Sequence, residues 1–194
     1  WCTTEEKETL ACSYKIYDML SHYIKGSVIK TDYNVTDYKR RDGSKHPFYV
    51  SSDINSATSH FNTKPFVLHD GTYIWIKMNG DEGGCYAEIS EKTTKRWGGT
   101  CGWITVDLNG SNSKPNTDGI DVFGFTIFTD GIAPQGTRYD NYWYPFSFEG
   151  QCAGEKITAG NLGRCSAWVL ENNNLDYLKC PEKLGWDKAL KCPK

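Results

Sequence analysis

The sequence predicts an α+β domain in which a long N-terminal helix packs on an antiparallel β-sheet. Three observations support this fold class: an opening segment with apolar residues at helical spacing, a central region of alternating apolar runs, and a cysteine-rich tail. No repeat and no strong linker divides the 194 residues. We therefore expect one domain over residues 1–194, with its loops and C-terminal tail fastened by disulfides.

The helix is expected over residues 4–25. Thr3 and Glu6 have the spacing of a capping box, and acidic residues in the first turn suit the helix dipole. An apolar stripe follows at intervals of three and four residues, and Gly26 is a natural stop. The stripe consists of Leu10, Tyr14, Tyr17, Leu20 and Ile24.

The rest of the chain divides by pattern. Residues 26–64 are polar and weakly patterned, which indicates a connecting loop region. Residues 65–128 alternate apolar and polar side chains between turn residues, which predicts the antiparallel sheet. We expect its strands at 66–68, 72–78, 85–90, 102–108 and 122–128. Residues 129–194 are expected to form loops and a disulfide-rich C-terminal region, with a short helix or strand at 166–170.

Composition and motifs narrow the function. A formal net charge of -2 favours neither nucleic acid nor an anionic membrane as a partner. The sequence has no G-x-S-x-G, no phosphate-binding P-loop and no histidines at close metal-binding spacing. We therefore expect a protein that is not an enzyme and has no catalytic residues. No apolar run approaches the roughly 18 residues that a membrane-spanning helix needs.

Eight cysteines without a CxxC pair indicate structural disulfides and an oxidising compartment. Cys85 and Cys101 flank a glycine-rich region between expected strands, so we expect a bridge between them. Cys152 and Cys165 enclose another glycine-rich loop and form the second expected bridge. Either loop would give roughly 3 kcal/mol of stabilisation in a chain-entropy model.

The other four cysteines are Cys2, Cys12, Cys180 and Cys192. If the helix starts at Thr3, Cys2 and Cys12 lie roughly 13 Å apart, because an α-helix rises about 1.5 Å per residue. A disulfide needs Cα atoms within roughly 7 Å, so this pair is incompatible with an intact helix. We therefore expect the tail to be stitched to the helix, with Cys12 bound to either Cys180 or Cys192. A Cys180–Cys192 bridge would contradict this arrangement.

Oxygen-bearing side chains crowd the stretch after residue 106. They are Asp107, Asn109, Asn116, Asp118 and Asp121. Gly110 and Gly119 would let the backbone fold tightly around an ion, so the stretch could hold a structural Ca²⁺. The alternative is that the Asp and Asn side chains bind their own backbone in Asx-turns.

A group of aromatic residues marks a second candidate site. Tyr139, Tyr142, Trp143 and Tyr144 could form a contact surface for a sugar or a protein. Core packing beneath a long loop would explain the same residues.

The stretch VDLNGSNSKPNTDGIDVFGF, residues 106–125, resembles the D-x-N-G…P-N-x-x-G-x-D-x-F signature of type IV pilin-like proteins and pseudopilins. The opening segment ETLACSYKIYDML resembles the second half of the long pilin helix, and residues 150–180 resemble the cysteine-bearing C-terminal region of that family. Eight cysteines exceed the family's usual number.

This resemblance implies a non-enzymatic subunit of a type IV pilus-like filament or a type II secretion pseudopilus, surrounded by other pilin subunits. It implies an extracellular location on a bacterium, reached through the inner membrane and periplasm. We expect an apolar half-helix upstream of Trp1 to make the only membrane contact. Some family members bind Ca²⁺ in a loop of the sheet region, which favours the cation hypothesis. The second functional hypothesis is a free-standing secreted carbohydrate- or protein-binding module.

Overall fold

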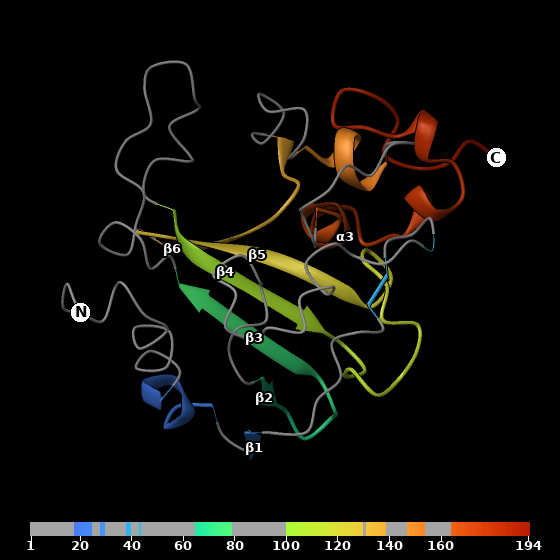
Figure 1. Cartoon of the computed structure of the whole chain (residues 1–194). Helices are drawn as coiled ribbons and strands as arrows, with labels where there is room; N and C mark the ends of the chain where they lie inside the picture. The colour runs from blue at the N-terminus through green and yellow to red at the C-terminus, as the bar shows by residue number, and fades with distance from the viewer. Residues whose placement is uncertain are drawn as a thin grey trace.

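The structure is a computed structural model that describes residues 18–24, 28–29, 38–39, 43, 65–78, 100–129, 131–138, 147–153 and 164–194. Its centre is a six-stranded antiparallel sheet in which the strands lie side by side in chain order, β1 to β6 (Figure 1). The strands are β1 (Val28–Ile29), β2 (Phe66–Val67), β3 (Tyr73–Met78), β4 (Thr100–Asp107), β5 (Val122–Phe128) and β6 (Gly131–Pro134).

Alternation along β3 explains why the sheet forms where it does. Tyr73 and Trp75 point to one face and pack with Tyr38 and Val122, whereas Ile76 points to the other and packs with Phe66. Full burial of a large apolar side chain stabilises a fold by about 1.5–3 kcal/mol. The two-faced pattern of YIWIKM is therefore enough to fix the register of β3 between its neighbours.

Short helices and turns pack on the sheet near β5 (Figure 1). They are the π-helical turn η4 (Phe148–Cys152), the α-helix α3 (Ser166–Asn172) and the 3-10 turns η5 (Asp176–Leu178) and η6 (Pro181–Lys183). Their buried side chains form one core with Phe123 of β5, which we call the C-terminal core. Its members are Phe123, Phe148, Cys152, Ala153, Cys165, Ala167, Trp168, Tyr177, Cys180, Leu184 and Trp186.

The predicted fold class is wrong for the described residues. They form mostly antiparallel sheet with short helices, and the longest helix among them, α3, has 7 residues. The expected long helix over residues 4–25 is described only at 18–24, where residues 18–21 are helical. Leu20 and Ile24 do pack against the sheet core at Ile76. Among the described residues, the helical segments that pack on the sheet are short ones, and the C-terminal core meets the sheet at Phe123.

The boundaries of the sheet region need a second correction. The strands expected at 66–68, 72–78, 102–108 and 122–128 are present within a residue or two, while the strand expected at 85–90 lies outside the described residues. The sheet also extends past residue 128, because β6 pairs with β5 from Phe128↔Gly131 to Phe125↔Pro134. The sequence predicts a loop in this segment, but Pro134 stands in an edge strand, where the missing N–H of a proline is tolerated.

The disulfides confirm one expected pair and overturn another. Cys152 and Cys165 are bridged, with Cα atoms 5.1 Å apart. Cys180 and Cys192 are also bridged, so the expected link from the tail to Cys12 is wrong. The tail closes on itself because the Oδ2 atom of Asp176 accepts a hydrogen bond of 2.9 Å from the Cys192 amide.

The remaining cysteines are only partly tested. Cys101 is disulfide-bonded, but Cys85, Cys2 and Cys12 lie outside the described residues, so the Cys85–Cys101 pair stays a prediction. Disulfides place the chain in an oxidising environment, extracellular or periplasmic. In the described part of the chain, no helix combines the length and apolar character needed to cross a membrane.

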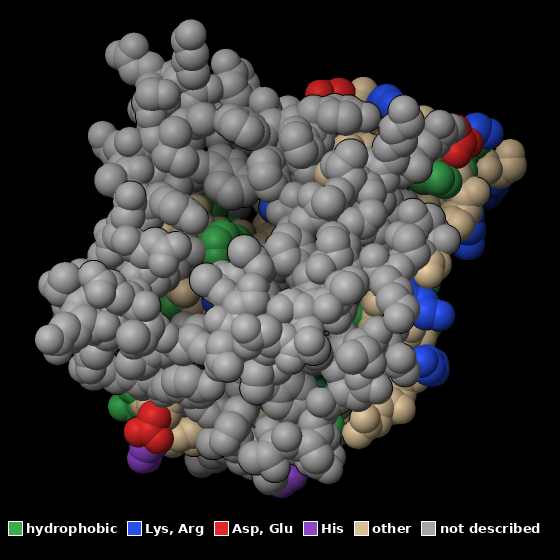
Figure 2. Space-filling model, viewed as in Figure 1, with side chains coloured by type: hydrophobic (Ala, Val, Ile, Leu, Met, Phe, Trp, Pro, Cys, Tyr) green, Lys and Arg blue, Asp and Glu red, His purple; other side chains and the backbone are tan. Residues whose placement is uncertain are grey.

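Charged side chains are mixed on the visible surface. Lys and Arg side chains gather on the right of the space-filling view, on the side where the C-terminal segment lies (Figures 1 and 2). The exposed lysines of this segment are Lys179, Lys183, Lys188, Lys191 and Lys194. Glu182 and Asp187 are exposed among them. Such interspersed charges are typical of a solvated surface.

Candidate functional site

The residues that carry the pilin-like signature form the connection between β4 and β5. Asp107 is the last residue of β4 and pairs with Val122, the first residue of β5. The intervening segment, together with Asp107, is called the signature loop (residues 107–121). Because the loop starts and ends at adjacent strand ends, its two terminal aspartates lie in one neighbourhood, and the charge of Asp121 affects the titration of Asp107.

Asp107 is fully buried and binds three donors. Its Oδ1 atom accepts hydrogen bonds from the amides of Asn109 (3.1 Å) and Gly110 (2.9 Å), and its Oδ2 atom accepts one from the Tyr38 hydroxyl. Burial raises the pKa of this carboxyl above its ordinary value of 3.8. The hydrogen bond from Tyr38 and the two amides oppose this rise, while the nearby negative charge of Asp121 adds to it.

Asp121 closes the other end of the signature loop. Its Oδ1 atom accepts a hydrogen bond of 2.6 Å from the Thr117 amide, and its Oδ2 atom accepts one of 2.8 Å from the Asn116 amide. The Asp121 carbonyl also accepts a hydrogen bond from the Leu108 amide, which joins the two ends of the loop. Both aspartates therefore bind backbone amides inside the loop. Asp107 does so as in an Asx-turn, whereas Asp121 binds amides four and five residues earlier in the chain.

Two asparagines brace the middle of the loop. The Nδ2 atom of Asn109 donates to the Lys114 carbonyl at 3.0 Å, and the Nδ2 atom of Asn116 donates to the Ser111 carbonyl at 2.7 Å. Asn116 takes a left-handed backbone conformation with a φ of 49°, which asparagine tolerates better than most residues. The Oδ1 atoms of both asparagines are buried and have no hydrogen-bond partner among the residues that the structure describes.

Gly110 and Gly119 stand where a side chain would collide. Gly110 has a φ of 78°, and a Cβ atom there would lie 2.7 Å from Cε1 of Tyr73. Gly119 has a φ of 72°, and a Cβ atom there would lie 2.5 Å from Sγ of Cys165. Gly110 therefore allows the loop to approach the sheet closely, and Gly119 allows it to approach the C-terminal core closely.

The signature loop is also the docking place of residues 38–39. The Lys39 amide donates to the Asn116 carbonyl at 2.9 Å, and the Asp118 amide donates to the Lys39 carbonyl at 3.1 Å. Tyr38 is fully buried and meets Trp75 edge to face, with ring centroids 6.0 Å apart. The predicted site thus includes a residue that sequence reasoning missed, because Tyr38 lies in a weakly patterned polar region far from the loop in sequence.

The hydrogen bonds of Asp107 and Asp121 favour the binding of backbone amides over the expected structural Ca²⁺ at these two carboxylates. Ca²⁺ prefers six to eight oxygen ligands, including charged carboxylates. At Asp107 and Asp121, five N–H or O–H donors already point at the carboxylate oxygens, and their positive hydrogens would oppose an arriving cation. The Oδ1 atoms of Asn109 and Asn116 belong to neutral amides, which bind Ca²⁺ more weakly than carboxylates do. Among the described residues, no group of three or more His, Cys, Asp or Glu could hold a metal ion.

The second predicted site is not described. Tyr139, Tyr142, Trp143 and Tyr144 lie outside the described residues, so the contact surface expected there stays a prediction.

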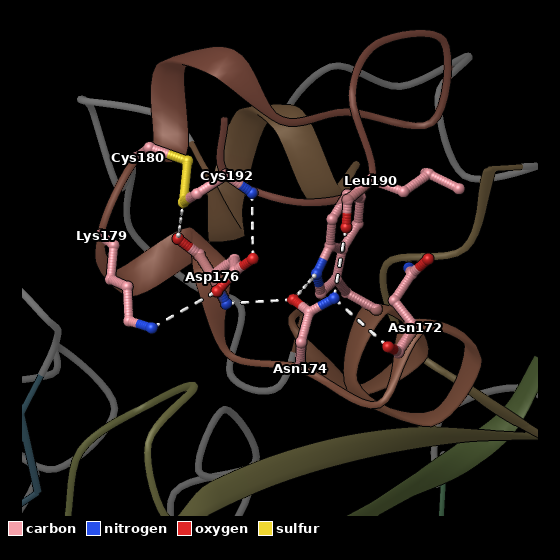
Figure 3. Close-up of polar contacts among 8 residues, drawn as sticks. Asn172, Asn174, Asp176, Lys179, Cys180, Leu190 and Cys192 are labelled. Atoms are coloured by element: carbon pink, nitrogen blue, oxygen red, sulfur yellow. Dashed lines mark hydrogen bonds and ion pairs between the residues drawn. A yellow bond between two sulfur atoms is a disulfide. The ribbon is translucent and has the colours of Figure 1, made fainter. Parts of the chain in front are cut away.

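A second polar cluster, which the sequence did not reveal, fastens the tail (Figure 3). The Oδ1 atom of Asn174 accepts hydrogen bonds from Nε1 of Trp168 and from the Asp176 amide, each 3.0 Å long. Its Nδ2 atom donates to the carbonyls of Asn172 and Leu190, each at 3.2 Å. One amide side chain thus ties together α3, η5 and the end of the chain. These contacts hold backbone segments in place, and we interpret their role as structural.

No protein-family model, curated protein sequence or solved structure matches this chain. The resemblance of residues 106–125 to the pilin-like signature therefore enters only as the basis of a proposal.

Proposed function

We propose that this chain is a non-enzymatic structural subunit, of the pilin or pseudopilin type, in an extracellular type IV pilus-like filament or a type II secretion pseudopilus. Its partners are then other pilin subunits, and its location is the bacterial cell surface. The Cys152–Cys165 and Cys180–Cys192 disulfides indicate an oxidising compartment, which agrees with that location.

The observation that carries the proposal is the use of the signature residues. Seven of the eight signature residues shape the signature loop or anchor it to the rest of the fold, and the eighth, Pro115, is exposed. The seven are Asp107, Asn109, Gly110, Asn116, Gly119, Asp121 and Phe123. A chance match to a sequence pattern would leave many positions without a structural task. A pattern in which most positions have such a task is what a family-wide structural motif requires.

The first test is recovery of the chain from filaments. Cells that produce the full-length protein are sheared, surface filaments are collected by sedimentation, and the chain is detected with an antibody. We expect the chain in the filament fraction. Recovery only as free protein in the medium would contradict the proposal, as would a conventional cleavable signal peptide in place of an apolar segment of about 20 residues upstream of Trp1.

Two asparagines of the same loop provide a matched pair of variants. Asn116 belongs to the signature and is buried, whereas Asn112 is exposed and lies outside the pattern. Asn116→Ala should reduce the amount of chain in the filament fraction, and Asn112→Ala should leave it unchanged. Equal incorporation of both variants into filaments would show that the signature residue Asn116 is not needed for assembly.

No observation on the described residues favours the alternative of a free-standing binding module. Its candidate residues, Tyr139, Tyr142, Trp143 and Tyr144, are not described. Glycan binding lost in Trp143→Ala would be the result that revives it.

A further inference from the structure

The two terminal aspartates of the signature loop, Asp107 and Asp121, accept hydrogen bonds from donors of this chain. Four backbone amides and one phenol point at their carboxylate oxygens. The amides come from the loop itself, so they hold it closed whatever else binds. The Tyr38 hydroxyl is different, because it comes from a segment 69 residues earlier in the chain.

The signature loop binds the backbone of residues 38–39 as well as the Tyr38 side chain. On either side of the Lys39 peptide, the Asn116 carbonyl accepts and the Asp118 amide donates, which makes a parallel β-bridge between Lys39 and Thr117. Tyr38 fills a closed space beside Trp75 and Val122, where its hydroxyl needs a buried partner. Asp107 supplies that partner. Side chain and backbone therefore engage the loop at the same time.

We propose that the signature loop is a binding site for the Tyr38–Lys39 segment of this chain, and that this segment takes the structural role expected of a bound cation. The loop then needs no metal to close. Tyr38 then attaches residues 38–39 to the loop between β4 and β5. This inference concerns the folded chain alone and does not depend on the proposed filament.

A double-mutant cycle on the 194-residue chain tests the link between Tyr38 and Asp107. Tyr38→Phe removes the hydroxyl and keeps the ring against Trp75, and Asp107→Ala removes the acceptor. We expect Tyr38→Phe to lower the melting temperature of the unaltered chain and to have little further effect in the Asp107→Ala background. An equal decrease in both backgrounds would overturn the proposal.

Tyr177 supplies the control for this cycle. Its hydroxyl donates to the Gly119 carbonyl at 2.7 Å, so it is another buried tyrosine that binds the same loop without touching Asp107. Tyr177→Phe should lower the melting temperature by the same amount with and without Asp107. Loss of the Tyr177→Phe effect in the Asp107→Ala background would mean that the loop had collapsed. The decision would then rest on the amide-exchange measurement that follows.

Hydrogen exchange at the Lys39 amide does not require the Asp107→Ala variant to fold. This amide is bonded to the Asn116 carbonyl, so it should be protected in the unaltered chain and in Tyr177→Phe. It should exchange faster in Tyr38→Phe. Unchanged protection in Tyr38→Phe would show that the hydroxyl does not hold the segment, and the proposal would fail.

Calcium titration tests the claim that no metal is needed. Thermal unfolding is compared in excess EDTA and with added CaCl₂, and we expect the same melting temperature in both. A cation bound only to the native state, present at roughly a hundred times its dissociation constant, would raise the melting temperature of a chain of this size by roughly 5–10 °C. A Ca²⁺-specific rise of that size, abolished in Asp121→Ala, would overturn the proposal.

Discussion

The ring of Phe148 lies flat on the indole of Trp168, with ring centroids 4.0 Å apart and ring planes inclined by 8°. Both side chains are fully buried, and Trp186 packs against Trp168 at a centroid distance of 5.1 Å. This aromatic stack is the centre of the C-terminal core, so the stability of the last third of the chain should depend on it.

Removal of one member of the stack should be costly. Phe148→Ala is expected to reduce the free energy of unfolding by about 3–5 kcal/mol, because it deletes buried surface and leaves a cavity. Equilibrium urea denaturation followed by tryptophan fluorescence measures the loss. Leu170→Ala is the control, since Leu170 is 62% exposed on α3, and it should change stability by less than about 0.5 kcal/mol. Similar losses for both variants would contradict the core assignment.

A comparison of alanine variants at Gly119 and Gly71 distinguishes the cost of backbone strain from the cost of a steric clash. Both have positive φ, 72° and 91°, so alanine at either position should cost about 1–2 kcal/mol of backbone strain. At Gly119 the new Cβ atom would also meet Sγ of Cys165, whereas at Gly71 it would have nothing within 4 Å. We expect Gly119→Ala to lower the melting temperature distinctly more than Gly71→Ala. A reversed order would mean that the loop does not press on the C-terminal core.

Asn174 should control the attachment of the tail. Asn174→Ala leaves Nε1 of Trp168 and the Leu190 carbonyl without their hydrogen bonds, at a cost of about 1–3 kcal/mol for a buried donor. Limited proteolysis should then cleave the segment after Asn174 faster than in the unaltered chain. Glu171→Ala, at an exposed position on the same helix, should leave the cleavage rate unchanged.

Asp107 and Asp70 should give opposite pH dependences. The pKa of Asp107 is raised by burial, so the folded state binds its proton more tightly than the unfolded state, and its contribution to stability falls as the pH rises above 3.8 through the folded pKa. The stability difference between the unaltered chain and Asp107→Asn should therefore grow as the pH is lowered from about 7 towards about 4.

Asp70 provides the contrast because its pKa is lowered, chiefly by the hydrogen bond from the Thr72 amide. Its contribution to stability should be present above 3.8 and disappear as the pH falls through the folded pKa. Urea denaturation of Asp107→Asn and Asp70→Asn at several pH values measures the two trends. Parallel trends would contradict the difference in burial between the two carboxyls.

The two disulfides of the C-terminal region close loops of nearly equal length, with sequence separations of 13 and 12 residues. Chain entropy alone predicts about 3 kcal/mol for either bridge. Cys152 and Cys165 are almost fully buried, whereas Cys192 is only partly buried, so replacement of the first pair by serine should cost more. Thermal unfolding of the two double-serine variants, one for each disulfide, shows which replacement lowers the melting temperature more.

The sheet could be predicted because its strands are local patterns. The alternation along β3 reports directly which face each side chain occupies, and the apolar run at β5 does the same. The alternation of apolar and polar residues does not show which distant segment of the chain covers a given face of the sheet. The C-terminal core is built from short turns with scattered aromatic residues, and no periodicity marks Phe148 and Trp186 as neighbours of Trp168.

The candidate site divides in the same way. Asp107, Asn109, Asn116 and Asp121 could be predicted as one turn-rich unit, because their contacts run mostly to neighbours in sequence. Such oxygens can bind either a metal or backbone amides. The outcome depends on the direction of the amide N–H groups, which cannot be deduced from residue types alone. The partner Tyr38 could not be predicted, since its contact crosses 69 residues of weakly patterned chain.

The order of the strands has a consequence for how the chain assembles. Every strand from β1 to β5 pairs with the strand that follows it, so the sheet can grow hairpin by hairpin as successive segments become available. The C-terminal core instead joins Phe123 to residues as late as Trp186, and its last bridge waits for Cys192. During export the sheet should therefore form first, with one end of its apolar surface uncovered until the tail arrives. That interval is when newly made chains are most exposed to aggregation and most in need of rapid oxidation.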